Sequence, residues 1–314
     1  MAVLAKYTNG NYRVLILDDG TKIRVNNGEP FVPTRFESAD IKITNQCLHN
    51  CPYCHEASSP MSVHADFARF KPFLDSIHPY TELAIGGGNP LLHPEFDSFL
   101  VYCKERQFIP SMTVNWRDLI QQKERIQKLT REKLIYGVGV SMPAPNERLS
   151  PEDEEVLKGA LAELPTAICH LILGIHTLDY IQRLAQRFYS PQVLLLGFKP
   201  VRRGLEYKQQ KDSVIQKNIE DVKFFFQDEC DYITQELNLE SVSFDNLALE
   251  QLDLLDLFRS KDPEYYMGDE GQFTMFVDLV KGEYAVSSTS MERFPLGGLT
   301  ADEIFQRVRR GGEC

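Results

Sequence analysis

Three cysteines close together are the residues of this sequence whose types and spacing best suit chemistry. Cys47, Cys51 and Cys54 have the spacing C-x3-C-x2-C, and soft thiolates suit zinc, copper(I) or iron–sulfur clusters. A closed zinc site needs four protein ligands, one more than this segment supplies. Three thiolates on a 4Fe–4S cluster instead leave one iron open to another ligand. Because C-x2-C alone also occurs in zinc and redox motifs, the interpretation depends on the full triplet.

The residues before the cysteines predict where in the fold they lie. Residues 39–44 alternate apolar and polar side chains, which is the period of a strand. The cysteines therefore follow the carboxyl end of a predicted strand. Active sites gather at that end in barrels of alternating strands and helices.

A second motif, Ala-Ile-Gly-Gly-Gly-Asn-Pro at residues 84–90, ends the next predicted strand. With both motifs, the chain resembles the radical S-adenosylmethionine (radical SAM) enzymes over about residues 38–200. Their signature is C-x3-C-x2-C, commonly with an aromatic before the third cysteine, which is Tyr53 here. Their second motif usually has two glycines, a glutamate and a proline, so Gly88 and Asn89 depart from it.

The resemblance implies a cofactor set and a reaction. The three cysteines would bind one 4Fe–4S cluster, and the open iron would chelate the amino and carboxylate groups of SAM. Reduction by a donor such as flavodoxin or ferredoxin would cleave SAM to a 5′-deoxyadenosyl radical, which abstracts hydrogen from the substrate. The cofactor-binding residues that the resemblance implies are Tyr53, Gly86, Gly87, Gly88, Asn89, Asn115, Ser141, Gly174 and Leu196.

Simpler explanations exist for several of these residues. The cysteines could form part of a zinc loop or be buried, and the glycines at 86–88 could form a tight turn. Three glycines exceed the needs of a turn, and bare backbone lets a ligand come close. Asn89 offers a neutral carbonyl acceptor where the family often has a carboxylate. Asn115 and Ser141 could be ordinary polar strand ends, and Lys199 could be simply solvated or pair with an anionic group.

The chain from residue 38 to 200 predicts alternating strands and helices. The strands are expected at residues 39–44, 82–85, 111–115, 134–141, 167–174 and 193–198. The helices between them are expected at residues 64–77, 94–106, 118–129, 150–164 and 178–188, with Ser150 as an N-cap. Such units give a parallel α/β sheet or open barrel, and the resemblance implies a partial (β/α)6 barrel.

Two further units flank this core. Residues 1–37 contain a β-hairpin, 12–17 and 21–25, around Asp19-Gly20. Residues 201–314 form an α+β extension that begins with a polar link. The elements expected after that link are a helix at 213–230, a strand at 241–245, a helix at 247–258, a hairpin at 272–280 and 283–288, and a helix at 300–309.

The C-terminal extension predicts a cover for the open barrel. We expect it to close the mouth and to place polar groups on the substrate, because a reactive radical must be shielded from water. Its substrate candidates are Asp245, Asp269 and Ser288. It contains only Cys230 and Cys314, too few thiols for a second cluster, while Cys103 and Cys169 are expected in the core.

Composition restricts the partners. The chain has 314 residues and a formal net charge of −11, and a negative surface repels the phosphates of duplex nucleic acid. Seven cysteines, three of them clustered, fit a reducing cytosol better than a disulfide framework. The N-terminus lacks a signal-peptide pattern, and no apolar run approaches the ~20 residues of a membrane span. We expect a soluble cytoplasmic protein.

The sequence therefore predicts a single-cluster radical SAM enzyme acting on a small polar or nucleotide-like substrate. One alternative is a peptide substrate, for which the N-terminal hairpin could offer a docking edge. A second alternative is a non-catalytic module that binds an iron–sulfur cluster or zinc for redox sensing or interaction.

Overall fold

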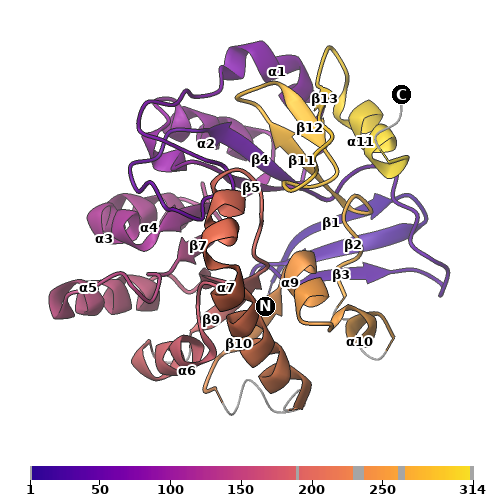
Figure 1. Cartoon of the computed structure of the whole chain (residues 1–314). Coiled ribbons are helices and arrows are strands. Elements are labelled where there is room, and N and C mark those ends of the chain that lie inside the picture. Colours follow the sequence, from indigo (N-terminus) through magenta and orange to yellow (C-terminus); the bar gives the residue numbers. More distant parts are fainter. Residues whose placement is uncertain (1, 189–190, 229–236, 261–265, 312–314) are drawn as a thin grey trace.

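The computed structural model describes residues 2–188, 191–228, 237–260 and 266–311 (Figure 1). Its main body is a ten-stranded sheet with the order β10-β9-β8-β7-β6-β5-β4-β11-β12-β13. Six neighbouring strands in this sheet are parallel and follow one another along the chain. They are β4 (Ser38–Thr44), β5 (Glu82–Gly87), β6 (Ile109–Asn115), β7 (Gly137–Ser141), β8 (Ala167–Ile172) and β9 (Gln192–Leu196). These strands confirm the predicted α/β class with a large parallel sheet.

Helices follow the strands and lie in an arc around the sheet (Figure 1). Apolar side chains at alternate strand positions, such as Ile41, Val114 and Leu171, share one core with these helices. The helices of this layer are α1 (Phe67–Ser76), η1 (Pro90–Leu92), α2 (Phe96–Glu105), α3 (Trp116–Gln121), α4 (Lys123–Arg131), α5 (Pro151–Ala162) and α6 (Leu178–Arg187). The helix predicted at 118–129 is instead two helices, which meet at Gln122, where the backbone leaves the helical region.

The C-terminal residues add strands to both edges of the parallel sheet. β10 (Ser241–Phe244) pairs in parallel with β9, and β11 (Thr274–Asp278) pairs in parallel with β4. β12 (Glu283–Ala285) forms the predicted hairpin with β11, and β13 (Phe294–Pro295) ends the sheet. The order runs from one edge strand to another, so the sheet is open among the described residues. The partial-barrel form stays a prediction.

The C-terminal helices differ from their predicted bounds. α7 (Arg203–Asp228) begins ten residues before the helix predicted at 213–230, in the segment expected to be a polar link, and it is kinked at Lys211. Tertiary packing outweighs the low helix propensity of Gly204 there. The helix predicted at 247–258 is divided into α9 (Asn246–Gln251) and α10 (Leu255–Ser260) by Asp253, which has a positive φ. Cys230 and Cys314 lie outside the described residues.

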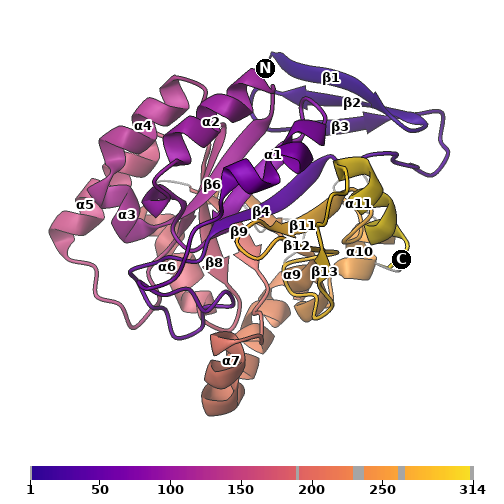
Figure 2. The ribbon, with the colours of Figure 1, turned by 90° about the horizontal axis from the view of Figure 1, so that it is seen from above.

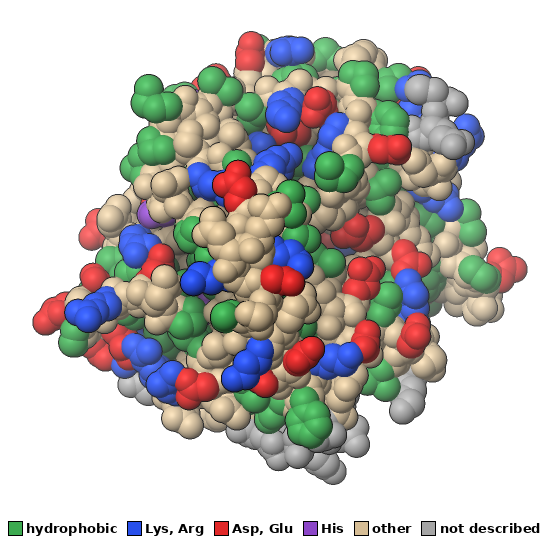
Figure 3. Space-filling view, viewed as in Figure 1, with side chains coloured by type: hydrophobic (Ala, Val, Ile, Leu, Met, Phe, Trp, Pro, Cys, Tyr) green, Lys and Arg blue, Asp and Glu red, His purple; other side chains and the backbone are tan. Residues whose placement is uncertain are grey.

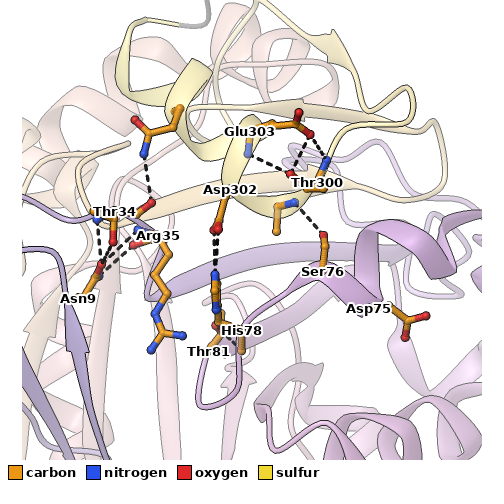
Figure 4. Close-up of polar contacts among 12 residues, drawn as sticks. Asn9, Thr34, Arg35, Asp75, Ser76, His78, Thr81, Thr300, Asp302 and Glu303 are labelled. Carbon is orange, nitrogen blue, oxygen red and sulfur yellow. Dashed lines mark hydrogen bonds and ion pairs between the residues drawn. The ribbon is translucent and has the colours of Figure 1, made fainter.

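The last helix, α11 (Ala301–Arg309), has the predicted capping box. The Thr300 hydroxyl accepts from the Glu303 backbone N–H at 3.3 Å, and the Glu303 carboxylate accepts from the Thr300 backbone N–H at 2.8 Å. The Ala301 N–H donates to the Ser76 hydroxyl at 2.8 Å, which joins this helix to α1 (Figure 4). The C-terminal end of the described chain is thus held against the first helix of the core.

The N-terminal unit is a three-stranded antiparallel sheet, which is one strand more than the predicted hairpin. Its strands are β1 (Val3–Asn9), β2 (Tyr12–Leu17) and β3 (Lys22–Val25). The turn before β2 uses Gly10 at φ +58°, so the Asn-Gly pair could have identified β1. The sheet packs on Ile109 and Phe273, at the amino ends of β6 and β11, on the side of the molecule away from α7 (Figure 2).

The surface, the helices and two cysteines can be compared with what the composition predicts. Figure 3 shows Lys and Arg side chains interspersed with Asp and Glu side chains on the face that carries α7. Of the described helices, none combines the length and the apolar composition that crossing a membrane requires. Cys103 and Cys169 are buried in the core, as predicted.

Candidate functional site

The three clustered cysteines lie in the loop after β4, at the carboxyl end of the strand as predicted. Their thiols are free and half-buried. Among the described residues, no three His, Cys, Asp or Glu side chains converge as the ligands of a single metal ion would. A 4Fe–4S cluster does not need that convergence, because each thiolate binds a different iron. The donor set therefore fits a cluster better than a single zinc ion.

Burial and the neighbouring cysteines oppose ionisation of two of these thiols, Cys47 and Cys51. Burial, followed by the charges of Cys54 and Cys47, raises the pKa of Cys51 to about 11. Burial also raises the pKa of Cys47. A free thiol with a raised pKa is protonated at neutral pH, so binding of a metal group must release protons. The positive charge of Arg203 acts in the opposite direction on both residues.

Two helices hold the cysteine loop from outside. The His49 ring nitrogen Nε2 lies 2.6 Å from the Asp118 carboxylate on α3. On the other side, Arg203 of α7 donates to Asn50 and to the Ser58 carbonyl. His49 is therefore part of the loop's support.

The three glycines at the end of β5 meet different surroundings. A Cβ at Gly87 would overlap the Thr44 carbonyl, and one at Gly88 would overlap the Gln46 carbonyl. Gly88 also donates its N–H to the Thr44 carbonyl at 2.8 Å. A Cβ at Gly86, in contrast, would have no heavy atom within 4 Å. The closeness of the cysteine loop explains two glycines, and only Gly86 faces space that a ligand can fill.

Asn89 is buried, and its side chain is half satisfied. Its Oδ1 accepts from the Leu91 N–H at 3.0 Å and so caps η1. Its Nδ2 is buried and has no hydrogen-bond partner among the described residues. The carbonyl that the sequence offered as an acceptor for SAM is thus engaged, and the free group is a donor. Reversing the amide would place its NH₂ against the Leu91 N–H.

The other predicted SAM contacts lie along the carboxyl ends of β6 to β9. Asn115 on β6 is paired in register with Ser141 on β7. Ser141 is in turn paired with His170 on β8. Asn115 also caps α3 by accepting from the Arg117 N–H at 3.0 Å. Leu196, at the end of β9, is half-buried. The structure therefore places Asn115 and Ser141 on neighbouring strand ends.

Two further residues of the predicted cofactor site contact α7. Gly174 has φ +77°, and a Cβ there would press on Ile215 of α7 at 2.6 Å. Tyr53 packs edge-on against Tyr207, with ring centroids 5.8 Å apart. Helix packing therefore accounts for the glycine at 174, as loop packing does for Gly87 and Gly88.

The sheet face opposite the helices, which we call the inner face, carries polar side chains. Asp40 of β4 keeps solvent-accessible surface, but the protein around its carboxyl displaces enough water to raise the pKa of that group. His170 of β8 lies against Gly139, where a Cβ would overlap its ring. Burial and the charge of Lys199 lower the pKa of His170 to about 4, so this imidazole is neutral at physiological pH.

Residues from the C-terminal third join this inner face. Lys199 donates to the Ser288 hydroxyl at 3.0 Å. Glu270 has a pKa raised by burial, and both Lys199 and Asp245 act on its charge. Of the three substrate candidates from the sequence, Asp245 and Ser288 thus lie with Lys199.

Asp269, the third substrate candidate, is placed elsewhere. Its carboxylate pairs with Arg259 and accepts from the Tyr266 hydroxyl at 2.5 Å, among exposed groups. Its neighbour Glu270 instead interacts with Ser287 and Lys199. Sequence reasoning missed Asp40 and His170 as site residues, although their strand positions alternate with core positions.

Known proteins match this chain in fold. No protein-family model matches the sequence, and no curated protein matches it significantly. Streptococcus suis SuiB bound to the precursor peptide SuiA is 13% identical with a TM-score of 0.60, covering 89% of this chain and 67% of that chain.

Two further SuiB structures are similar. SuiB bound to S-adenosylmethionine is 13% identical with a TM-score of 0.56, covering 84% of this chain and 64% of that chain. A third SuiB structure is 10% identical with a TM-score of 0.63, covering 97% of this chain and 86% of that chain. At these identities the likeness shows the fold: a mixed α/β chain with a large parallel sheet.

Proposed function

We propose that this chain is a radical SAM enzyme that holds one 4Fe–4S cluster through Cys47, Cys51 and Cys54. The observation that carries the proposal is the position of three free, half-buried thiols after the first parallel strand of this sheet. A protein of the same fold, SuiB, has been solved with S-adenosylmethionine bound. When bound and reduced, such a cluster supplies the electron that cleaves SAM to a 5′-deoxyadenosyl radical.

The residues around the loop would bind and orient SAM. Gly86 leaves space beside the cysteine loop, and Asn89 offers a buried donor, which suits a carboxylate oxygen better than an ammonium group. Asn115 and Ser141, on adjacent strand ends, offer further polar contacts. Tyr53 supports the loop through its contact with α7.

We propose a peptide as the substrate class, in place of the small polar or nucleotide-like substrate that the sequence favoured. The support is the fold shared with SuiB, which has been solved with a precursor peptide bound. The inner face offers polar groups to a peptide. These groups are Asp40, His170, Lys199, Asp245, Glu270 and Ser288.

The N-terminal sheet is not the nearest place for such a peptide to meet the cofactor. β1–β3 packs at the amino ends of the large sheet, through Ile109 and Phe273, whereas the cysteines follow the carboxyl end of β4. A peptide docked on that sheet would have to extend to the other end of the strands. We therefore propose that the C-terminal residues on the inner face contact the reacting part of the peptide.

The decisive experiment is anaerobic reconstitution followed by incubation with SAM and a reductant. We expect about four irons and four sulfides per chain and formation of 5′-deoxyadenosine. Cys51→Ala should abolish this cleavage, while Cys103→Ser, a change of a buried core thiol, serves as a control for the loss of one cysteine. Full cleavage by Cys51→Ala would contradict the proposal.

The substrate class needs a separate measurement. Peptides and nucleosides with deuterium on carbon would be offered in parallel, and 5′-deoxyadenosine would be examined for deuterium. We expect transfer from a peptide pool only. Transfer from nucleosides alone would restore the small-substrate alternative, and an iron-loaded chain that never cleaves SAM would favour the non-catalytic module.

A further inference from the structure

The first turn of α7 contacts the cysteine loop through one side chain. Arg203 is the first residue of the helix, and its Nη1 donates to the Asn50 side-chain oxygen at 2.6 Å. Its Nη2 donates to the Ser58 carbonyl at 2.9 Å. Because Asn50 precedes Cys51 and Ser58 follows Cys54, one guanidinium connects both ends of the segment that carries two of the thiols. The planar fork of arginine suits such a pair of acceptors.

The backbone around Arg203 fits closely against the same loop. A Cβ on Gly204 would overlap the Lys199 carbonyl and lie 3.5 Å from the Tyr53 carbonyl. One turn further, Tyr207 meets the ring of Tyr53 edge-on. Glycine at position 204 therefore allows α7 to begin here. The start of the helix at this point places Arg203 against the loop.

The guanidinium has one group that the loop does not use. Its Nε–H is buried and has no hydrogen-bond partner among the described residues. Leaving a buried donor of a charged group without a partner is costly. Because its Nη1 donates to Asn50, the residue before Cys51, the positive charge of Arg203 lies close to the thiol-bearing segment. A sulfur acceptor at the three cysteines would suit both the donor and the charge.

We propose that Arg203 is a positioning residue of the cluster site, which fixes the cysteine loop and places a positive, hydrogen-bonding group beside the thiolates. This role rests on the proposed function. A cation at this place stabilises the more negative, reduced state of a cluster, so it raises the reduction potential. The C-terminal third therefore serves the cofactor as well as the substrate.

Two variants separate the charge from the shape of Arg203. Arg203→Gln removes the charge, and Arg203→Lys keeps the charge but loses the fork. Arg183→Gln on α6, an exposed arginine paired with Asp179, is the matched control. Hydrogen exchange of residues 47–59 would be measured in the metal-free protein, and iron retention and midpoint potential would be measured after anaerobic reconstitution.

We expect roughly tenfold faster exchange of the loop in both Arg203 variants, because hydrogen bonds to a charged group are lost. Iron should be lost severalfold faster from both. The midpoint potential should shift to more negative values in Arg203→Gln and remain near the wild-type value in Arg203→Lys. Arg183→Gln should match the wild type in all three measurements.

Two results would overturn the role of Arg203. Unchanged exchange in the metal-free Arg203→Gln protein would show that Arg203 does not hold the loop. A wild-type midpoint potential in the iron-loaded Arg203→Gln protein would show that Arg203 has no electrostatic effect on the cluster. Wild-type protein that takes up no iron would instead overturn the proposed function, and the exchange result would still decide whether Arg203 positions the loop.

Discussion

The consecutive glycines 86, 87 and 88 show how one motif divides into separate roles at the scale of single residues. Gly87 and Gly88 let the cysteine loop approach β5, since any Cβ there would overlap a carbonyl of residues 44 or 46. Gly86 has the strand conformation and open space beside it. A side chain at Gly86 therefore tests ligand binding, whereas one at Gly88 tests folding.

We predict that Gly86→Val weakens SAM binding by about tenfold, or ~1.4 kcal/mol, because its side chain fills that space. Gly88→Ala should instead lower the free energy of unfolding by ~1–3 kcal/mol, as overpacking does. Calorimetric titration of the reconstituted protein with SAM, together with urea denaturation, separates the two effects. If Gly86→Val bound SAM as the wild type does, the open space would have no role in binding.

Single residues also mark the limit of prediction from the sequence. The motif located the cysteine loop and the glycines, because both are local patterns in the chain. The use of Asn89 as a cap and the inward position of Asp40 depend on neighbours that the motif does not contain. Parallel sheets usually have both faces covered, so alternation along β4 did not indicate that Asp40 keeps solvent-accessible surface.

At the scale of elements, sequence periodicity predicted most of the strands and helices of the core. It did not predict which strands pair when they lie far apart in the chain. The six parallel strands were predicted because each has a local apolar pattern followed by a helix. The hairpin of β11 and β12 was predicted too, but its pairing with β4 joins residues far apart in the chain. The early start of α7 was missed because Gly204 disfavours helix, while contact with Tyr53 favours it.

The start of α9 gives a prediction that separates a structural from a substrate role. The Asp245 carboxylate caps α9 through the Ala248 N–H at 2.7 Å and accepts from the Gly197 N–H at 2.9 Å. Asp245→Ala should therefore cost ~1–2 kcal/mol of unfolding free energy, and Asp245→Asn much less. Urea denaturation measures both.

Asp269 is the matched control for Asp245, because it is the other predicted aspartate and belongs to an exposed pair. Asp269→Ala should change the unfolding free energy by no more than ~0.5 kcal/mol. A fully stable Asp245→Ala protein would contradict the capping role. Loss of substrate turnover in a stable Asp245→Asn protein would favour direct contact with the substrate.

At the scale of the whole molecule, a buried ion cluster joins three distant segments. Lys42 of β4 lies 2.5 Å from the Glu56 carboxylate in the cysteine loop and 3.2 Å from the Asp278 carboxylate at the end of β11. All three residues are buried. The site loop and the C-terminal strands are thus coupled through one lysine. Truncation of the chain after residue 200 would remove Asp278 together with β10 and β11. A single substitution therefore tests the coupling more specifically than a truncation.

We predict that Lys42→Met lowers the free energy of unfolding by ~3–5 kcal/mol, because it leaves the buried Asp278 carboxylate without its cation and the buried Glu56 carboxylate with only Arg202, at 3.7 Å, as a remaining cation. Lys71→Met is the control, since the Lys71–Asp75 pair on α1 is exposed, and its effect should stay within ~0.5 kcal/mol. Changing the partners as well, in Lys42→Met with Glu56→Gln and Asp278→Asn, should recover part of the loss, because the unpaired charges are removed. Urea denaturation of the metal-free proteins gives these values without any contribution from a cofactor. A Lys42→Met protein as stable as the Lys71→Met control would show that the cluster does not hold the site loop to the C-terminal strands.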